Sequence, residues 1–265
     1  MTEISLDLTA LLATLLYWRE CGIDRLSGEG FGFAPLEAPA TPVMVERVEP
    51  SRLVKEALPQ PPPVSLDRLL SEPVSPAEKV SLMAELAREV SQCQQCRLAL
   101  TRQKTVFGTG SLEAPVVFVG DVPKAEEELA QEPFIGEARE MMNGIVRAAR
   151  LRRQEIYITN TIQCRPPGDR QPKTDEMIQC QGYLYRQLEI IRPKVIFAMG
   201  KVAIEGLLGR VGSVGEARGK VHAWRGVPVI ASYHPAFCQR SPGSKRAVWE
   251  DLILLMKTLE TSRSA

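Results

Sequence analysis

Four short apolar segments, each followed by a stretch of helical character, limit what this chain can fold into more than any other feature. The apolar segments are 115–120, 156–159, 195–199 and 227–231. The helical stretches are 136–151, 174–191, 202–208 and 245–259. Continuous apolar strands that alternate with helices are typical of a mostly parallel sheet with helices on both faces. The pattern predicts an α/β fold, a three-layer α/β/α arrangement around a central, mostly parallel four-stranded sheet.

Chemically useful side chains follow three of these four predicted strands. Asp121, Asn160 and His234 lie just past strand ends, and Gly200 follows the remaining strand. In an open parallel sheet, ligands bind in the crevice beyond the carboxyl ends of the strands. We therefore expect the functional site at that edge of the sheet.

The N-terminal part of the chain is organised differently. Leucines between Leu8 and Leu16 recur at helical spacing and predict a short helix within 1–25. Half of the 20 prolines fall between Pro35 and Pro76, so we interpret 26–76 as a disordered, proline-rich linker. A docking segment for another protein is the alternative to a plain spacer. Ser75-Pro76 predicts a helix start, and we expect one folded domain over 77–265.

Charge is distributed unevenly along a chain whose net charge is +1. Acidic side chains outnumber basic ones in 1–90, and the reverse holds in 91–265. A basic domain suggests a polyanionic partner, although a merely solvated basic surface gives the same count. No apolar run reaches the ~18 residues of a membrane-spanning helix, and the stretch 11–17 lacks the basic leader of a secretory signal. We therefore expect a cytoplasmic protein.

The chain has six cysteines, at positions Cys21, Cys93, Cys96, Cys164, Cys180 and Cys238. Cys93 and Cys96 are spaced to place two thiolates on one metal centre, and Cys164 and Cys180 would complete a set of four. Four thiolates suit an iron–sulfur cluster or structural zinc, and the spacing does not choose between them. Unrelated buried thiols are a third reading. Cys21 and Cys238 have no evident partner and are interpreted as structural.

Four motifs stand in order along 91–260. They are Cys93-Gln94-Gln95-Cys96 followed by Arg97-Leu98, Pro133-Phe134-Ile135-Gly136, Ile158-Thr159-Asn160 continuing into Cys164-Arg165-Pro166-Pro167, and Tyr233-His234-Pro235-Ala236. In this order and spacing they resemble the family 4 uracil-DNA glycosylases, the iron–sulfur type of bacteria and archaea.

The resemblance implies a DNA-repair enzyme with a uracil-DNA glycosylase-like fold. Such an enzyme flips uracil out of single- or double-stranded DNA and hydrolyses the N-glycosidic bond. The resemblance also implies a [4Fe-4S] cluster of structural role, bound by Cys93, Cys96, Cys164 and Cys180. No membrane and no obligate protein partner are expected.

The same resemblance assigns roles around the base. Phe134 matches the aromatic residue that stacks on the flipped base, and Asn160 matches the amide that reads the edge of uracil. His234 matches the residue that lies against uracil O2, where a donor stabilises the leaving anion. Arg240 follows the His234 loop and is expected to bind a DNA phosphate.

The first motif departs from the family pattern. Asp121 stands where the family has Glu, and we expect it and Glu127 to share the catalytic carboxylate work with His234. Val122 replaces a small residue at the base, Lys124 replaces a glycine, and Arg139 stands where the family usually has glycine. We favour a working glycosylase. The alternative is an iron–sulfur DNA-binding paralogue with weakened or lost catalysis.

Overall fold

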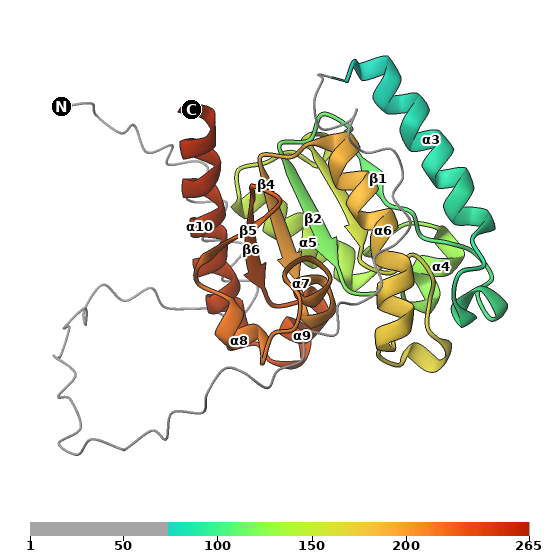
Figure 1. The fold of residues 1–265 in the computed structure, drawn as a ribbon. Coiled ribbons are helices and arrows are strands. Elements are labelled where there is room, and N and C mark those ends of the chain that lie inside the picture. The colour runs from blue at the N-terminus through green and yellow to red at the C-terminus, as the bar shows by residue number, and fades with distance from the viewer. Residues whose placement is uncertain (1–73, 265) are drawn as a thin grey trace, which may run out of the picture. The chain divides into compact units, whose positions relative to one another are not determined.

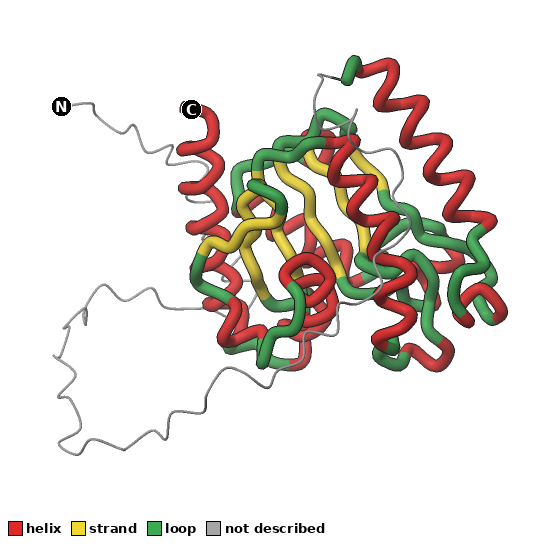
Figure 2. The backbone as a smooth tube through the Cα atoms, viewed as in Figure 1, coloured by secondary structure: helices red, strands yellow, loops and turns green. Residues whose placement is uncertain are grey.

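The computed structural model describes residues 74–264 (Figures 1 and 2). The helix expected within 1–25, Cys21 and nearly all of the segment 26–76 lie outside the described residues, so those domain boundaries stay predictions. In chain order, the helices are α3 (Pro76–Gln92), α4 (Ala125–Ala130), α5 (Glu137–Ala148), α6 (Thr174–Ile191), α7 (Lys201–Leu208), α8 (Val214–Ala217), α9 (Pro235–Arg240) and α10 (Ser244–Ser264). The strands are β1 (Thr109–Gly110), β2 (Val116–Gly120), β3 (Ile156–Asn160), β4 (Val195–Met199), β5 (Val221–Trp224) and β6 (Val227–Ser232). Three 3₁₀ helices, η2 (Arg97–Leu100), η3 (Arg153–Glu155) and η4 (Pro167–Asp169), lie in the connections.

The sheet has six strands in the order β1-β3-β2-β4-β6-β5. The central four are parallel, as the sequence predicted, while β1 and β5 add antiparallel edges. The sequence predicted four strands, and the sheet has six because of these two edge strands. β1 has two residues, too few for periodicity to show. In β5 only Trp224 is buried, and the strand reaches β6 through Arg225 and Gly226, both with positive φ.

The two faces of the sheet are covered by different helices, which confirms the three layers. Successive strand residues point to opposite faces. Val117 and Val119 pack in the core formed with α3, α6 and α7. Val116 and Phe118 pack in the core formed with α5 and α10. Figure 1 shows α3 and α6 on one side of the sheet and α5 on the other.

Helix ends follow the local sequence. The Ser75 hydroxyl accepts the N–H of Glu78 at 3.3 Å, and Pro76 occupies the first turn of α3, where no N–H partner is needed.

The bounds of α6 agree with the prediction, whereas the short helices α4, α8 and α9 were not anticipated. Within residues 74–264, no helix is both long and apolar enough to cross a bilayer.

Candidate active site

The carboxyl ends of the parallel strands bring the expected residues to one edge of the sheet. Gly120, the last residue of β2, is in register with Asn160, the last residue of β3. Met199 at the end of β4 is in register with Ser232 at the end of β6, two residues before His234. Four segments that are distant in sequence therefore meet at the edge where the sequence placed the site.

Asn160 and Phe134 converge on the backbone of Gly120. A Cβ atom at Gly120 would lie 2.4 Å from Asn160 Oδ1 and 2.8 Å from Phe134 Cζ. Both side chains are buried, with exposed fractions of 1% and 2%. Nδ2 of Asn160 has no hydrogen-bond partner among the residues that the structure describes. A buried amide donor without a partner costs about 1–3 kcal/mol, which a ligand carbonyl would offset.

The backbone of Phe134 is held from both sides. Its φ of +56° lies in the left-handed region, which is unfavourable for an aromatic residue. Its N–H donates to Oε1 of Glu127, whose Oε2 accepts the N–H of Lys124 at 2.6 Å. Its carbonyl accepts from Nε of Arg139 at 3.4 Å, and Arg139 pairs with Glu132 at 2.7 Å. Glu127 and Arg139 therefore fix the loop that presents the aromatic ring.

His234 lies against Phe134, with ring centroids 5.4 Å apart and planes at 24°. It precedes α9, and its Nδ1 accepts the N–H of Ala236 at 3.2 Å. Burial, helped by the charges of Lys124 and Arg240, lowers the pKa of His234 to about 4. The ring is therefore neutral at pH 7, and because Nδ1 accepts, its proton is on Nε2.

A buried polar network supports the loop that carries His234. The hydroxyl of Ser232, at the end of β6, donates to Asp251 of α10 at 2.8 Å. Arg218 donates to the same carboxylate at 3.1 Å, and its guanidinium lies 5.9 Å from the centre of the Tyr233 ring. Sequence reasoning assigned no role to Arg218 or Asp251, since neither stands at a strand end; Asp251 was noted only within the family-like segment Trp249-Glu250-Asp251-Leu252.

Asp121 turns toward the first turn of α7. Its Oδ1 accepts the N–H of Ala203 at 2.9 Å. Gly200, with φ +101°, makes room for this carboxyl, because a Cβ there would lie 2.3 Å from Oδ2. Burial raises the pKa of Asp121 to about 7, although the backbone N–H groups of Ala203 and Val202 act in the opposite direction. Asp121 is thus a carboxyl that titrates near neutral pH at the end of β2.

The remaining candidate residues occupy different surroundings. Val122 is buried in the core on the α3, α6 and α7 face, so its side chain packs into the protein. Lys124 is exposed just before α4, and Arg240 is exposed in the last turn of α9. The contact of Val122 with a base and the contact of Arg240 with phosphate both stay predictions.

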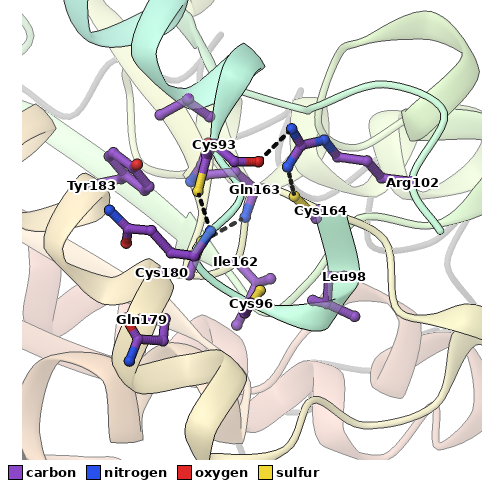
Figure 3. Close-up of a pocket in the computed structure, with 12 residues that line it drawn as sticks. Cys93, Cys96, Leu98, Arg102, Ile162, Gln163, Cys164, Gln179, Cys180 and Tyr183 are labelled. Atoms are coloured by element: carbon purple, nitrogen blue, oxygen red, sulfur yellow. Dashed lines mark hydrogen bonds between the residues drawn. The ribbon is translucent and has the colours of Figure 1, made fainter. Parts of the chain in front are cut away.

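All four nominated cysteines line one pocket (Figure 3). Cys93 and Cys96 follow α3 and are half-buried, while Cys164 follows β3 and Cys180 lies in α6, both buried. Within residues 74–264, no three His, Cys, Asp or Glu side chains lie close enough together to hold a metal ion. The four thiols thus share a pocket without a preformed metal-binding geometry. Cys238 is buried separately, in the core beside α10, in agreement with its structural interpretation.

The surroundings of these sulfurs fit a thiolate-bound centre. Arg102 donates from Nη1 to Cys164 Sγ at 3.3 Å and from Nη2 to the carbonyl of Cys93 at 2.7 Å (Figure 3). The N–H of Gln163 donates to Cys180 Sγ at 3.3 Å. Burial raises the pKa of Cys164 and Cys180, so these thiols need compensating positive charge to ionise. N–H donors to sulfur and a nearby guanidinium are the groups that such a centre uses.

The comparison with protein families decides which fold family presents this site. A family model described as the uracil DNA glycosylase superfamily matches residues 107–253, more than half of the chain. The chain belongs to the uracil-DNA glycosylase superfamily. The match spans the site residues at the sheet edge together with Cys164 and Cys180, whereas Cys93 and Cys96 precede it.

Similar proteins place the chain near one type within the superfamily. The type-4 uracil-DNA glycosylase of Archaeoglobus fulgidus is 39% identical over 160 residues, 57% of this chain and 80% of the relative. That of Thermotoga maritima is 36% identical over 175 residues, 64% of this chain and 91% of the relative. That of Saccharolobus solfataricus is 32% identical over 185 residues, 66% and 86% of the two chains. The predicted resemblance to type-4 glycosylases is confirmed.

Two further residues escaped sequence reasoning, one at the sheet edge and one in the cysteine pocket. Gly120 was counted as the end of a strand, but the absence of a side chain is what lets Asn160 and Phe134 approach. Arg102 was not considered, yet it bridges two cysteine segments. The signal for Arg102 was its position within a few residues of the Cys93/Cys96 pair.

Proposed function

We propose that this protein removes uracil from DNA by hydrolysing the N-glycosidic bond of a flipped nucleotide. The observation that carries the proposal is the convergence of Asn160, Phe134 and His234 at one sheet edge of a uracil-DNA glycosylase fold. The reaction needs a group that recognises the base, a donor for the departing uracil anion, and a group that handles water at the sugar. The site supplies a residue for each task.

Recognition of the base falls to Phe134 and Asn160. An aromatic face stacks on any base. The unpartnered Nδ2 of Asn160 provides a donor for O4 of uracil, and its carbonyl oxygen provides an acceptor for N3–H. Cytosine has a donor at C4 and an acceptor at N3, which is the opposite polarity. This amide therefore favours uracil over cytosine.

His234 stabilises the leaving group. Its low pKa keeps the ring neutral near pH 7. Because Nδ1 accepts the N–H of Ala236, the single ring proton is on Nε2, which can donate a hydrogen bond to the base. A hydrogen bond from Nε2 to uracil O2 strengthens as negative charge develops on the base. A neutral imidazole that acts as an electrophile in this way is a known catalytic arrangement.

Asp121 handles water and the sugar. With a pKa of about 7, it is ionised in a large fraction of molecules near neutral pH and is matched to accept a proton from attacking water. Its negative charge also offsets positive charge on the sugar in the transition state. Both oxygens of Glu127 are engaged by backbone N–H groups, so we assign Glu127 to positioning Phe134 rather than to proton transfer.

Cys93, Cys96, Cys164 and Cys180 would hold a [4Fe-4S] cluster in this proposal. Bound there, the cluster would link the segment after α3 to the segment after β3 and to α6, which is a structural role. Arg102 and the N–H of Gln163 would stabilise the thiolate charge. Anaerobically purified protein is then expected to contain iron and acid-labile sulfide in equal amounts, each at about four per chain. Zinc at one per chain would contradict the cluster.

The decisive experiment for the function is base release from a single-stranded oligonucleotide that carries one uracil. The expected product is an abasic site that hot alkali converts to a strand break. No break is expected before alkali, because the proposed reaction is hydrolysis by water and assigns no role to a lysine amine. A matched oligonucleotide with cytosine at the same position is the control. Intact uracil DNA at large enzyme excess would overturn the glycosylase proposal and favour a DNA-binding paralogue without catalysis.

A further inference from the structure

A groove of about 670 Å³ lies at the β1 edge of the sheet, beside the loop that carries Phe134. Phe134 lines one part of it, and Arg153 of η3, immediately before β3, lines another. Phe134 lies near the carboxyl end of the sheet and η3 lies at the amino end of β3, so the groove lining includes residues from both ends of this edge. Phe134 belongs both to the groove lining and to the proposed base site, whereas Asn160 and His234 do not line the groove.

The groove carries uncompensated positive charge. Arg139 and Arg153 both line it, together with one carboxylate, that of Glu132. Glu132 is already paired with Arg139 at 2.7 Å. Arg153 has no hydrogen bond or ion pair among residues 74–264, although it is half-buried. Burial lowers the pKa of Arg153 and the charge of Arg139 adds to this effect, while the carboxylate of Glu132 acts in the opposite direction. The two guanidinium groups of the groove therefore share a single carboxylate.

Neutral polar side chains complete the wall. The amides of Asn143 and Gln154 and the hydroxyl of Thr109 line the groove beside Arg153. Gly110 leaves the β1 side without a side chain, because a Cβ there would lie 2.1 Å from the carbonyl oxygen of Ile156. A guanidinium among amides and hydroxyls is the donor set that binds phosphate and sugar groups of nucleic acids.

We propose that this groove binds the backbone of the DNA strand that flanks the flipped nucleotide, with Arg153 as a phosphate ligand. The inference deepens the proposed function, since it places the flank next to the base held at Phe134. A polyanionic strand fits the observations because the groove is open, shares Phe134 with the base site and carries Arg153, a cation without an ion pair among residues 74–264. Neither Asp121 nor His234, the two residues proposed to act in the chemical step, lines the groove.

The test compares two neighbouring arginines. Arg153→Gln removes the groove cation, whereas Arg152→Gln removes a cation that is exposed, bonded to Glu155 and absent from the groove lining. Binding of a uracil-free single strand of about 16 nucleotides is measured by fluorescence anisotropy across a salt series. For Arg153→Gln we expect three- to tenfold weaker binding at about 100 mM salt and a salt slope smaller by about 0.7. For Arg152→Gln we expect neither change.

A second experiment tests on which side of the uracil the flanking strand contacts Arg153. Uracil oligonucleotides are prepared with long flanks on both sides, or with one flank trimmed to a single nucleotide. The rise in KM caused by Arg153→Gln should shrink when one particular flank is trimmed and persist when the other is trimmed. Equal effects of the two arginine variants, no effect of Arg153→Gln, or an effect independent of both flanks would overturn the groove proposal. Because the first experiment uses DNA without uracil, failure of the glycosylase proposal would leave that result unchanged.

Discussion

The ring of Phe134 lies against the imidazole of His234, with centroids 5.4 Å apart and planes inclined by 24°. One residue belongs to the loop after α4 and the other to the segment between β6 and α9. Their contact joins the group proposed to stack on the base with the group proposed to stabilise its departure. A change that moves one ring therefore alters the surroundings of the other.

Replacing His234 by Leu should slow the chemical step. Leu has no polar atom, so the substitution removes the Nε2–H donor at the developing anion, and loss of one such donor costs roughly 10²–10³ in rate. Single-turnover release of uracil measures this step. The fold should survive, which circular dichroism checks. A rate within about threefold of the unaltered protein would exclude His234 from leaving-group stabilisation.

The pH dependence of uracil release should follow the ionisation of Asp121 and not that of His234. Activity is expected to rise with pH through an apparent pKa of about 7, as Asp121 ionises, and to show no step from His234, whose pKa is about 4. In Asp121→Asn the rate should be low and the step near pH 7 absent. A step that persists in Asp121→Asn would assign it to another group.

The carboxyl of Asp121 should also make the free energy of unfolding depend on pH. The folded pKa of Asp121, about 7, lies above its ordinary value of 3.8, so ionisation disfavours the folded state. The contribution of Asp121 is therefore present at low pH and is lost as the pH rises from about 4 to about 7. Chemical denaturation of the unaltered protein and of Asp121→Asn should show a smaller pH dependence in the variant over this interval. Identical pH dependence in the two proteins would contradict the raised pKa.

Glu127→Gln should loosen the loop that carries Phe134. A carboxylate accepts both backbone N–H groups, whereas an amide offers one acceptor oxygen and turns its NH₂ group toward the other donor. We expect unfolding to become easier by about 1–3 kcal/mol, together with a higher KM for uracil DNA. Glu126→Gln is the matched control, because Glu126 is the exposed neighbour on α4. If kcat falls by orders of magnitude with unchanged stability and KM, Glu127 acts chemically instead.

Gly120→Ala should disable base recognition without destroying the sheet. The added methyl group would meet Asn160 Oδ1 at 2.4 Å and Phe134 Cζ at 2.8 Å, so both side chains must move. Uracil release should fall sharply while the elution volume of the folded domain is retained. Gly243→Ala is the matched control, since no atom lies within 4 Å of its Cβ position and Gly243 does not have a positive φ. Normal activity in Gly120→Ala would show that the base does not bind here.

Cys164→Ser should lower the iron content of purified protein, and Cys238→Ala should not. Cys164 lies in the pocket with the other three nominated ligands, whereas Cys238 is buried in a different part of the core. Iron and acid-labile sulfide analysis of the two variants separates the cases. Equal iron loss in both would point to a general folding defect rather than ligation.

Much of this arrangement could be predicted from the sequence because its signals are local. The four central strands are continuous apolar runs, and the positions beyond their ends gave Asp121, Asn160 and His234. The edge strands could not be found this way, since β1 has two residues and β5 exposes most of its side chains.

The roles of individual carboxylates also needed the fold. Glu127 accepts the N–H of Phe134, seven residues away, and Asp121 accepts the N–H of Ala203, 82 residues away. No periodicity or spacing encodes such contacts, because they depend on how loops pack at the sheet edge. Arg139, a departure from the family pattern, could be recognised as a support for Phe134 only once that packing was known.

Direct detection of free uracil tests the central claim most closely. The unaltered protein and Asn160→Ala are each mixed, in excess, with a single-stranded oligonucleotide carrying one uracil, and the released base is measured by chromatography. Our account predicts stoichiometric release of uracil by the unaltered protein and little or none by Asn160→Ala. No release by cluster-loaded, unaltered protein, or equal release by both, would contradict it.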